Sequence, residues 1–287
     1  MIFWQCHPVI LSSLQERKVP LPTNFQFSQA SLADYADCAR RFQLRYLLEQ
    51  AWPAVEAEPI LERERLMALG QRFHKLIQQH IEGLPVEQLT ASLNDAELIR
   101  WWDQYQRALT STLRDLPANR RAEVALTMPI GQRYRLVAHC DLIAADDERV
   151  VIVDWKTEHR RATREQLLAR LQTRVYRYVV TEVLQRAPGT VAMIYWFAEY
   201  PNQPEMLSYD AAQHAADQQY FTELIAEIEE RATRDGEWDK TPNERKCAYC
   251  TYRSLCNRGT VAGVIQADDE NDLEIEVRLE DVDEIAY

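Results

Sequence analysis

Glycine is scarce in this chain of 287 residues. Seven glycines are present, where average usage predicts about 20. The glycine-rich phosphate-binding motifs G-x-G-x-x-G and G-x-x-x-x-G-K-[ST] do not occur, and H-E-x-x-H and G-x-S-x-G are also missing. Dinucleotide-binding and P-loop classes therefore lose their main support, and so do zincin proteases and α/β-hydrolases.

Long apolar runs are missing too. No segment approaches the ~18–20 apolar residues of a membrane span. The apolar N-terminus MIFWQCHPVILSSLQ has no basic region and no A-x-A cleavage site, so we expect a strand or packing segment rather than a signal peptide. Six cysteines in a chain of this size favour metal binding or free thiols over a disulfide framework. We expect a cytoplasmic protein.

Charge is unevenly distributed along the chain. The net charge is −12, but residues 268–287 hold ten acidic side chains and a single basic one, Arg278. The rest of the chain is only slightly acidic, so a nucleic-acid partner is not excluded. Because the tail sequence LEIEVRLEDVD alternates apolar and acidic residues, it is interpreted either as an edge strand or DNA mimic, or as a solubilising extension.

Hydrophobic periodicity predicts an α/β fold with helices first. The expected helices cover residues 28–49, 61–82 and 93–115. Strands are expected at 121–129, 133–145 and 149–155, and the last of these is apolar throughout, as in a strand buried on both faces. A helix from a Thr163–Gln166 capping box to about 186, a strand at 190–198 and a helix at 211–234 complete the core.

Carboxylates occur at the ends of the predicted strands. Asp141 lies in HCDLI, and Asp154 and Lys156 lie in VVIVDWKT. Strand geometry places Asp154 and Lys156 on one face, and a buried carboxylate is costly unless it is paired. Two carboxylates beside an ammonium can bind Mg²⁺ or Mn²⁺ and activate water for phosphodiester hydrolysis. The alternative is a structural Asp–Lys pair.

The cysteines form a second constellation. Cys247, Cys250 and Cys256 are spaced C-x2-C-x5-C near the C-terminus, and three thiols need a fourth ligand. Cys38 is the preferred candidate, with Cys6 and Cys140 as alternatives, and Cys140 is expected to be a core thiol. A triplet with one distant cysteine is typical of a 4Fe–4S cluster. A zinc site or free thiols remain as alternatives.

Six motifs, taken together and in order, resemble the RecB-like branch of the PD-(D/E)xK nuclease superfamily. They are similar to its iron–sulfur members, which include CRISPR-associated exonucleases and the nuclease domains of helicase–nucleases. The matching segments cover about residues 28–258 and are SLADYADCARRFQLRYL, Gly70-x-x-x-His74, HCDLI, DWKT, Gln172-x-x-x-Tyr176 and CAYCTYRSLC. Ala39 replaces the family's proline after the first cysteine, and the usual glycine before Asp141 is missing.

The resemblance implies a restriction-endonuclease-like fold, with a central mixed sheet flanked by helices and an N-terminal helical elaboration. We expect one nuclease domain over residues 1–262 and an acidic tail over 263–287. Within the domain, we expect a helical part at 28–120, a catalytic sheet core at 121–200 and a cysteine segment at 246–258.

The resemblance also implies roles for individual residues. His74, Asp141 and Asp154 would bind Mg²⁺ or Mn²⁺ together with the carbonyl of Trp155, and Lys156 would assist the attack by water. Gln172 and Tyr176 would position the substrate. Glu123, on the strand before Asp141, is an extra candidate ligand or a solvated residue.

The implied cluster would be held by Cys38, Cys247, Cys250 and Cys256. It would tie the N-terminal helix to the C-terminal segment, a long-range closure worth several kcal/mol by analogy with disulfides. Basic and aromatic residues flank these cysteines, so we expect either a DNA-binding patch or solvated helix faces. The DNA-binding candidates are Arg40, Arg41, Tyr249 and Arg253, with Arg45, Lys246, Tyr252 and Arg258 nearby.

The resulting prediction is a metal-dependent deoxyribonuclease, acting as an exonuclease on single-stranded DNA ends and carrying a structural 4Fe–4S cluster. A helicase or a CRISPR, defence or repair protein is the expected type of partner. The alternative is an iron–sulfur module without catalytic activity that binds DNA or a partner, or a redox sensor that uses the cluster as its switch.

Overall fold

The computed structural model describes residues 19–50, 58–248 and 250–259, and only the backbone of residues 58–64. Several features named above lie outside these ranges. They are the apolar N-terminal segment with Cys6, Tyr249 and the acidic tail at 263–287.

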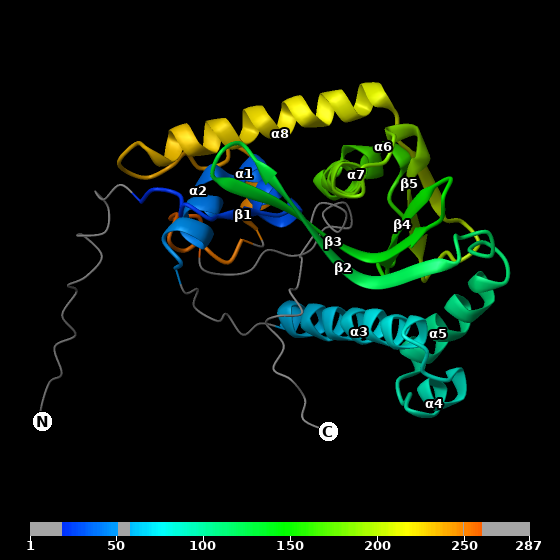
Figure 1. Ribbon diagram of the computed structural model, residues 1–287. Coiled ribbons are helices and arrows are strands. Elements are labelled where there is room, and N and C mark those ends of the chain that lie inside the picture. Colours follow the sequence, from blue (N-terminus) through cyan, green and yellow to red (C-terminus); the bar gives the residue numbers. More distant parts are fainter. Residues whose placement is uncertain (1–18, 51–57, 249, 260–287) are drawn as a thin grey trace, which may run out of the picture.

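A six-stranded mixed sheet forms the centre of the described chain (Figure 1). Its strand order is β1-β3-β4-β5-β6, and β2 also pairs with β3. The β2–β3, β3–β4 and β5–β6 pairs are antiparallel, whereas β1–β3 and β4–β5 are parallel. The strand bounds are β1 Gln26–Phe27, β2 Asn119–Ile130, β3 Tyr134–Ala145, β4 Val150–Lys156, β5 Val191–Phe197 and β6 Glu205–Ser208.

The two turns that join β2 to β3 and β3 to β4 contain residues that stabilise a chain reversal. Gly131, between β2 and β3, has a φ of 60°, which glycine adopts without steric cost. Between β3 and β4, the Asp146 carboxylate accepts hydrogen bonds from the backbone N–H groups of Glu148 and Arg149. These turns fix the β2–β3–β4 register on which the site depends.

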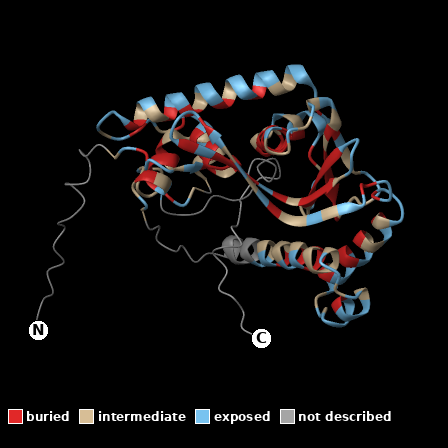
Figure 2. Cartoon of the chain, viewed as in Figure 1, coloured by how far each residue is buried: buried red, intermediate tan, exposed pale blue. Residues whose placement is uncertain are grey.

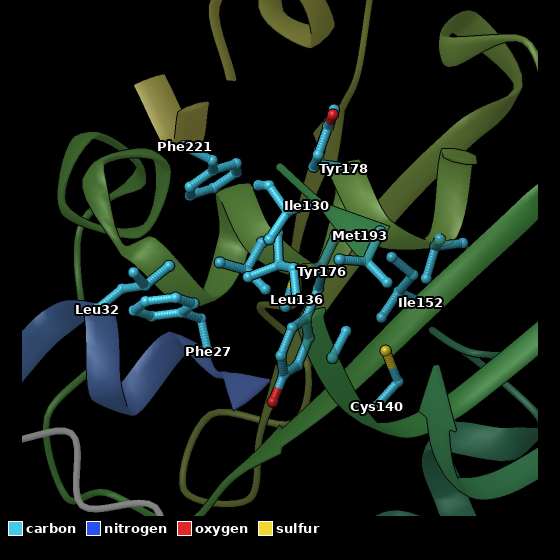
Figure 3. Packing of buried hydrophobic residues seen from close by; sticks show 14 of the residues in the cluster. Phe27, Leu32, Ile130, Leu136, Cys140, Ile152, Tyr176, Tyr178, Met193 and Phe221 are labelled. Atoms are coloured by element: carbon cyan, nitrogen blue, oxygen red, sulfur yellow. The ribbon is translucent and has the colours of Figure 1, made fainter. Parts of the chain in front are cut away.

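One face of the sheet is covered by α1 (Gln29–Asp37), α7 (Leu171–Val183) and α8 (Ala211–Ala232), as Figure 1 shows. Side chains from these helices and from the sheet form one hydrophobic cluster. In Figure 3, Phe27 and Leu32 lie near Tyr176 and Leu136 in this cluster. Cys140 belongs to it and is 1% exposed, which confirms the expected core thiol.

The opposite face is covered by α3 (Glu58–Ile81) and α5 (Ala96–Leu109), beside the short helix α4 (Val86–Ala91). Here the core is aromatic: Trp101, Trp102 and Tyr105 of α5 pack near Trp155 and Trp196 of the sheet. Figure 2 shows buried residues on the faces of α3 and α5 that meet the sheet. Strand β4 is buried on both faces, as its apolar sequence predicts.

The expected helices are present, but two of them are interrupted. The predicted helix at 28–49 is divided at Cys38, whose backbone is extended, into α1, α2 (Ala39–Phe42) and a π-helical segment (Gln43–Leu47). The predicted helix at 163–186 is divided at Arg170 into α6 (Arg164–Ala169) and α7, and the Thr163–Gln166 capping box begins it as expected. Strands β1 and β6 and helix α4 were not expected, because each is too short for a periodic signal.

No helix within the described ranges is both long and apolar enough to span a membrane.

Candidate active site

Asp141 and Asp154 lie at the point where β3 and β4 separate. The paired register of the two strands ends at Leu142 opposite Val153, so the aspartates are the next residues on their strands. Asp141 Oδ2 accepts a hydrogen bond of 2.8 Å from the backbone N–H of Trp155. The Asp141 carboxylate therefore accepts the hydrogen bond that a backbone carbonyl of the neighbouring strand would accept in a continuous sheet. Where β3 and β4 separate, their residues are acidic and are not paired through the backbone.

Lys156, Asp154 and Gln172 form a closed polar triangle. Lys156 Nζ lies 3.0 Å from Asp154 Oδ2 and donates to Gln172 Oε1 at 3.0 Å. Gln172 Nε2 donates to Asp154 Oδ1 at 2.7 Å. Asp154 is 2% exposed, so these contacts offset the cost of burying its charge. The predicted catalytic carboxylate, lysine and glutamine are thus in direct contact.

Two residues that the sequence did not single out, Tyr195 and Thr173, support this triangle together with the predicted Tyr176. The Tyr195 hydroxyl of β5 donates to Gln172 Oε1 at 3.2 Å and lies 2.7 Å from Thr173 Oγ1. Tyr176 is buried, and its hydroxyl lies 3.4 Å from Gln172 Nε2. Tyr195 sits in the apolar run TVAMIYWFA and has no pattern that separates it from a core tyrosine. Its role is visible only from the parallel pairing of β4 and β5, which places it opposite Asp154.

His74 reaches the same point from α3 on the other side. Its Nε2 donates to the carbonyl oxygen of Trp155 at 3.0 Å, and its Nδ1 lies 3.4 Å from Asp141 Oδ1. Gly70, one turn earlier, allows the close approach, because a Cβ at that position would lie 3.1 Å from Thr157 Oγ1. The Gly70-x-x-x-His74 pattern therefore has a physical reason: the glycine brings the helix close enough for the histidine to contact β4.

Glu123 completes the group from β2. Ligand atoms of His74, Glu123 and Asp141 all lie within 4.8 Å of one another. Asp154 is not part of that set but faces Asp141 across the strand separation. A second set, Glu97, His159 and Glu199, lies on the surface, where Glu199 is already held by Arg100 and by the indole N–H of Trp101. We assign it no role.

The electrostatics of the site reflect crowded acidic groups. Burial raises the pKa of Asp154 to about 7 despite the opposing effect of Lys156, and Asp141 contributes to the rise. Burial, assisted by Asp141, likewise raises the pKa of Glu123 to about 7. Burial alone would lower the pKa of His74, but the Asp141 carboxylate raises it to about 9. Without a cation, Asp154 and Glu123 therefore hold their protons to a higher pH than ordinary carboxyl groups do, whereas His74 lowers the pKa of Asp141.

The donor set fits a divalent cation. It consists of carboxylates, one imidazole and the Trp155 carbonyl oxygen, which suits Mg²⁺ or Mn²⁺. Asp154 Oδ2 is buried and contacts the Lys156 ammonium at 3.0 Å. A carboxylate oxygen is a suitable ligand for either cation.

The four cysteines of the predicted cluster come together away from this site. Cys38, at the break between α1 and α2, accepts a hydrogen bond of 3.4 Å from the Thr241 N–H. Burial raises the pKa of Cys250 and that of Cys256, and nearby thiols of the same set add to both shifts. Cys38, Cys247, Cys250 and Cys256 are all free thiols.

The flanking arginines are engaged in contacts within the protein. Arg40 is 7% exposed and pairs with Glu237, and Arg41 pairs with Asp34 and Asp37. Arg253 is also 7% exposed and donates to the Ala248 carbonyl oxygen. The Arg40 contact joins α2 to the chain at Glu237, the Arg41 contacts join α2 to α1, and the Arg253 contact lies within the cysteine segment, so these side chains do not form an open basic surface. The sequence alone could not distinguish a DNA-binding arginine from one that contacts other parts of the protein, because both occur as basic residues near a cysteine.

Comparison with known proteins gives one matching family model and several similar solved structures. The family model of the PD-(D/E)XK nuclease superfamily matches residues 26–257. The fold also resembles SSO0001, with 12% identity, a TM-score of 0.38, and coverage of 88% of this chain and 92% of that one. A "Putative exonuclease" from Eubacterium rectale has 9% identity, a TM-score of 0.48, and coverage of 86% and 92%.

None of the curated proteins matches the sequence significantly. The match to the family model spans the sheet, the flanking helices and the cysteine segment, and it includes every residue of the site described above. The chain belongs to the PD-(D/E)XK nuclease superfamily.

Proposed function

We propose that this protein is a metal-dependent deoxyribonuclease whose active site is the group formed by His74, Asp141, Asp154 and Lys156. The observation that carries the proposal is the convergence of these side chains, from three different elements, at the separation of β3 and β4. The pairing of a buried carboxylate with an ammonium beside a second carboxylate is what phosphodiester hydrolysis requires.

Each residue has a distinct task in the proposed hydrolysis. His74, Asp141, Asp154 and the Trp155 carbonyl would hold Mg²⁺ or Mn²⁺. A bound cation would supply an activated water and neutralise charge on the phosphate. Lys156 would orient the attacking water and stabilise the negative charge that develops on the phosphate oxygens. Gln172 fixes Lys156 and Asp154 relative to each other through its amide, and Tyr176 supports Gln172.

The preferred substrate in this proposal is the end of single-stranded DNA. The support is the resemblance of the six ordered motifs to CRISPR-associated exonucleases and helicase–nucleases. A helicase or a CRISPR, defence or repair protein is the proposed type of partner, and the cytoplasm is the proposed location. The free state of the described cysteines agrees with a reducing compartment.

The proposal includes a structural 4Fe–4S cluster on Cys38, Cys247, Cys250 and Cys256. Two observations support it. The fold gathers four thiols from distant parts of the chain, and N–H groups of Thr241 and Arg258 point at the sulfurs of Cys38 and Cys247 at 3.4 and 3.7 Å.

The test is cleavage of end-labelled single- and double-stranded DNA by the full chain, purified without oxygen, in Mn²⁺ or Mg²⁺. We expect cleavage by the wild type and by Asp103→Asn, an exposed surface change, and none by Asp154→Asn. Cluster-loaded wild-type protein that binds DNA but leaves it intact under both metals would instead support the binding module or redox sensor.

A further inference from the structure

The backbone of β2 has an interruption at Glu123. Ala122 pairs with Leu142 and Val124 pairs with Cys140, but the intervening pair, Glu123 and Asp141, is missing from an otherwise continuous ladder. The register is the same on both sides, so no residue is inserted. The two residues face each other across the ribbon without forming ladder hydrogen bonds.

Glu123 also has a φ of 49°, in the left-handed region. That conformation is uncommon for a residue with a Cβ and costly within a strand. Glu123 lies inside a twelve-residue strand rather than in a turn, so no chain reversal requires it. Strained residues of this kind persist only where the surrounding structure fixes them, and they concentrate at functional sites.

At the interruption, the side chains of β3 change the side of the sheet to which they point. Tyr134, Leu136, Ala138 and Cys140 of β3 pack into the cluster beneath α7, whereas Leu142 packs into the opposite cluster beneath α5. The Glu123–Asp141 step is therefore where the alternation reverses. At this step the two carboxylates come together beside His74, with ligand atoms of all three within 4.8 Å.

Two carboxylates held side by side repel each other unless a positive charge lies between them. Lys75 of α3 supplies positive charge near Glu123, and Asp141 and Asp154 supply negative charge from β3 and β4. The carboxylate oxygens of Glu123 and Asp141 and a ring nitrogen of His74 converge on one point. A cation bound there would relieve the repulsion between the carboxylates.

We propose that Glu123 is a ligand of the active-site cation, together with His74 and Asp141. The strained backbone at Glu123 turns its carboxylate toward this point. The inference rests on the proposed function, and it adds a ligand from β2 to the set of His74, Asp141 and Asp154. It implies that cation affinity in the absence of DNA also depends on a residue of β2.

The test is a titration of the metal-free full chain with Mn²⁺ in the absence of DNA. Binding is measured by calorimetry and by the electron spin resonance signal of free Mn²⁺. Glu123→Gln is expected to weaken binding at least tenfold. Glu148→Gln, the same change in the exposed β3–β4 turn, is the matched control and is expected to bind as the wild type does. Wild-type affinity in Glu123→Gln would overturn the inference.

A second variant guards against misfolding. Glycine accommodates the positive φ, so Glu123→Gly is expected to fold and yet lose Mn²⁺ affinity to the same extent. A purely structural role for Glu123 predicts the opposite pattern, with a lower melting temperature and unchanged affinity in the folded protein, and that result contradicts the inference.

The two proposals fail in different ways. If wild type binds Mn²⁺ and cleaves DNA while both Glu123 variants bind Mn²⁺ equally well, only the ligand role of Glu123 is wrong. If the wild type neither binds Mn²⁺ nor cleaves DNA, the proposed function fails and the ligand role fails with it.

Discussion

The Tyr195 hydroxyl donates to Gln172 Oε1, the same oxygen that accepts the hydrogen bond from the Lys156 ammonium. This contact fixes which way the Gln172 amide faces, because its oxygen must point to the two donors and its nitrogen to Asp154. A residue with no direct place in the proposed chemistry therefore orients the proposed catalytic lysine and carboxylate.

Tyr195→Phe removes that donor and keeps the ring. We expect kcat to fall about tenfold with little change in KM, as is typical when a supporting hydrogen bond behind a catalytic group is lost. The cost in the free energy of unfolding is expected to be about 1 kcal/mol. Steady-state kinetics and chemical denaturation measure the two effects. A fall in stability with unchanged kcat would show that Tyr195 serves only the core.

Gly70→Ala tests how closely α3 must approach β4. Alanine favours a helix interior over glycine by about 1 kcal/mol, but the added Cβ would lie 3.1 Å from Thr157 Oγ1. We expect an unchanged or slightly higher free energy of unfolding together with weaker Mn²⁺ binding, because His74 moves away from Asp141. Thr157→Ala in the same chain removes the opposing oxygen and is expected to restore the affinity. Mn²⁺ binding equal to wild type in Gly70→Ala would contradict this explanation.

The sequence predicted the residues proposed to act in the reaction better than the residues that hold them in place. Asp141, Asp154 and Lys156 were singled out because a charged residue stands out in an apolar strand, and His74 and Gln172 because the resemblance to the nuclease superfamily implies them. Tyr195 and Thr173 were not found, since tyrosine and threonine are ordinary in buried positions. Their role depends on a contact between β5 and α7 that no local pattern encodes.

The fold shows the same division. The long helices and the three successive strands were predicted, because their periodic patterns are long enough to be read. Breaks at Cys38 and Arg170 were missed, since both lie inside apolar patterns that continue past them. Cys38 is extended and accepts a hydrogen bond from Thr241, a tertiary contact that overrides local helix preference. The domain boundaries stay a prediction.

The pKa of Glu123, raised by burial and Asp141 to about 7, sets a pH dependence of stability. A carboxyl whose folded pKa exceeds its unfolded value stabilises the fold at low pH, and this contribution is lost as the pH rises from about 4 to about 7. The metal-free protein is therefore expected to lose stability across that window, and Glu123→Gln to lose less. Urea denaturation at pH 5 and pH 8 measures the difference. An equal loss in both proteins would contradict the shift.

Cation binding should depend on pH in the opposite sense. Ligands must be unprotonated, and the pKa of His74 is raised by Asp141 to about 9 while that of Asp154 is raised by burial to about 7. Mn²⁺ affinity is thus expected to increase from pH 6 to pH 9, with protons released on binding. Calorimetry in buffers of different ionisation enthalpy detects the release. An affinity independent of pH would show that these groups are not ligands.

Cys38→Ala tests the proposed cluster against a thiol in the core. We expect anaerobically purified wild type to contain four irons and four sulfides per chain with visible absorbance, and Cys38→Ala to lose both. Cys140→Ala, a change of the buried thiol of β3, is expected to retain them and to cost about 1 kcal/mol of stability. Stoichiometric zinc without iron in the wild type would replace the cluster with a zinc site.

Cleavage of end-labelled single-stranded DNA by wild type and Lys156→Ala is the most direct test of the central claim. Both proteins are purified without oxygen and assayed in Mn²⁺ and in Mg²⁺, with melting curves to show that the variant is folded. We predict metal-dependent cleavage by the wild type and a loss of at least a thousandfold in Lys156→Ala, because the ammonium beside Asp154 acts in the transition state. Equal cleavage by the two proteins would contradict the proposed active site.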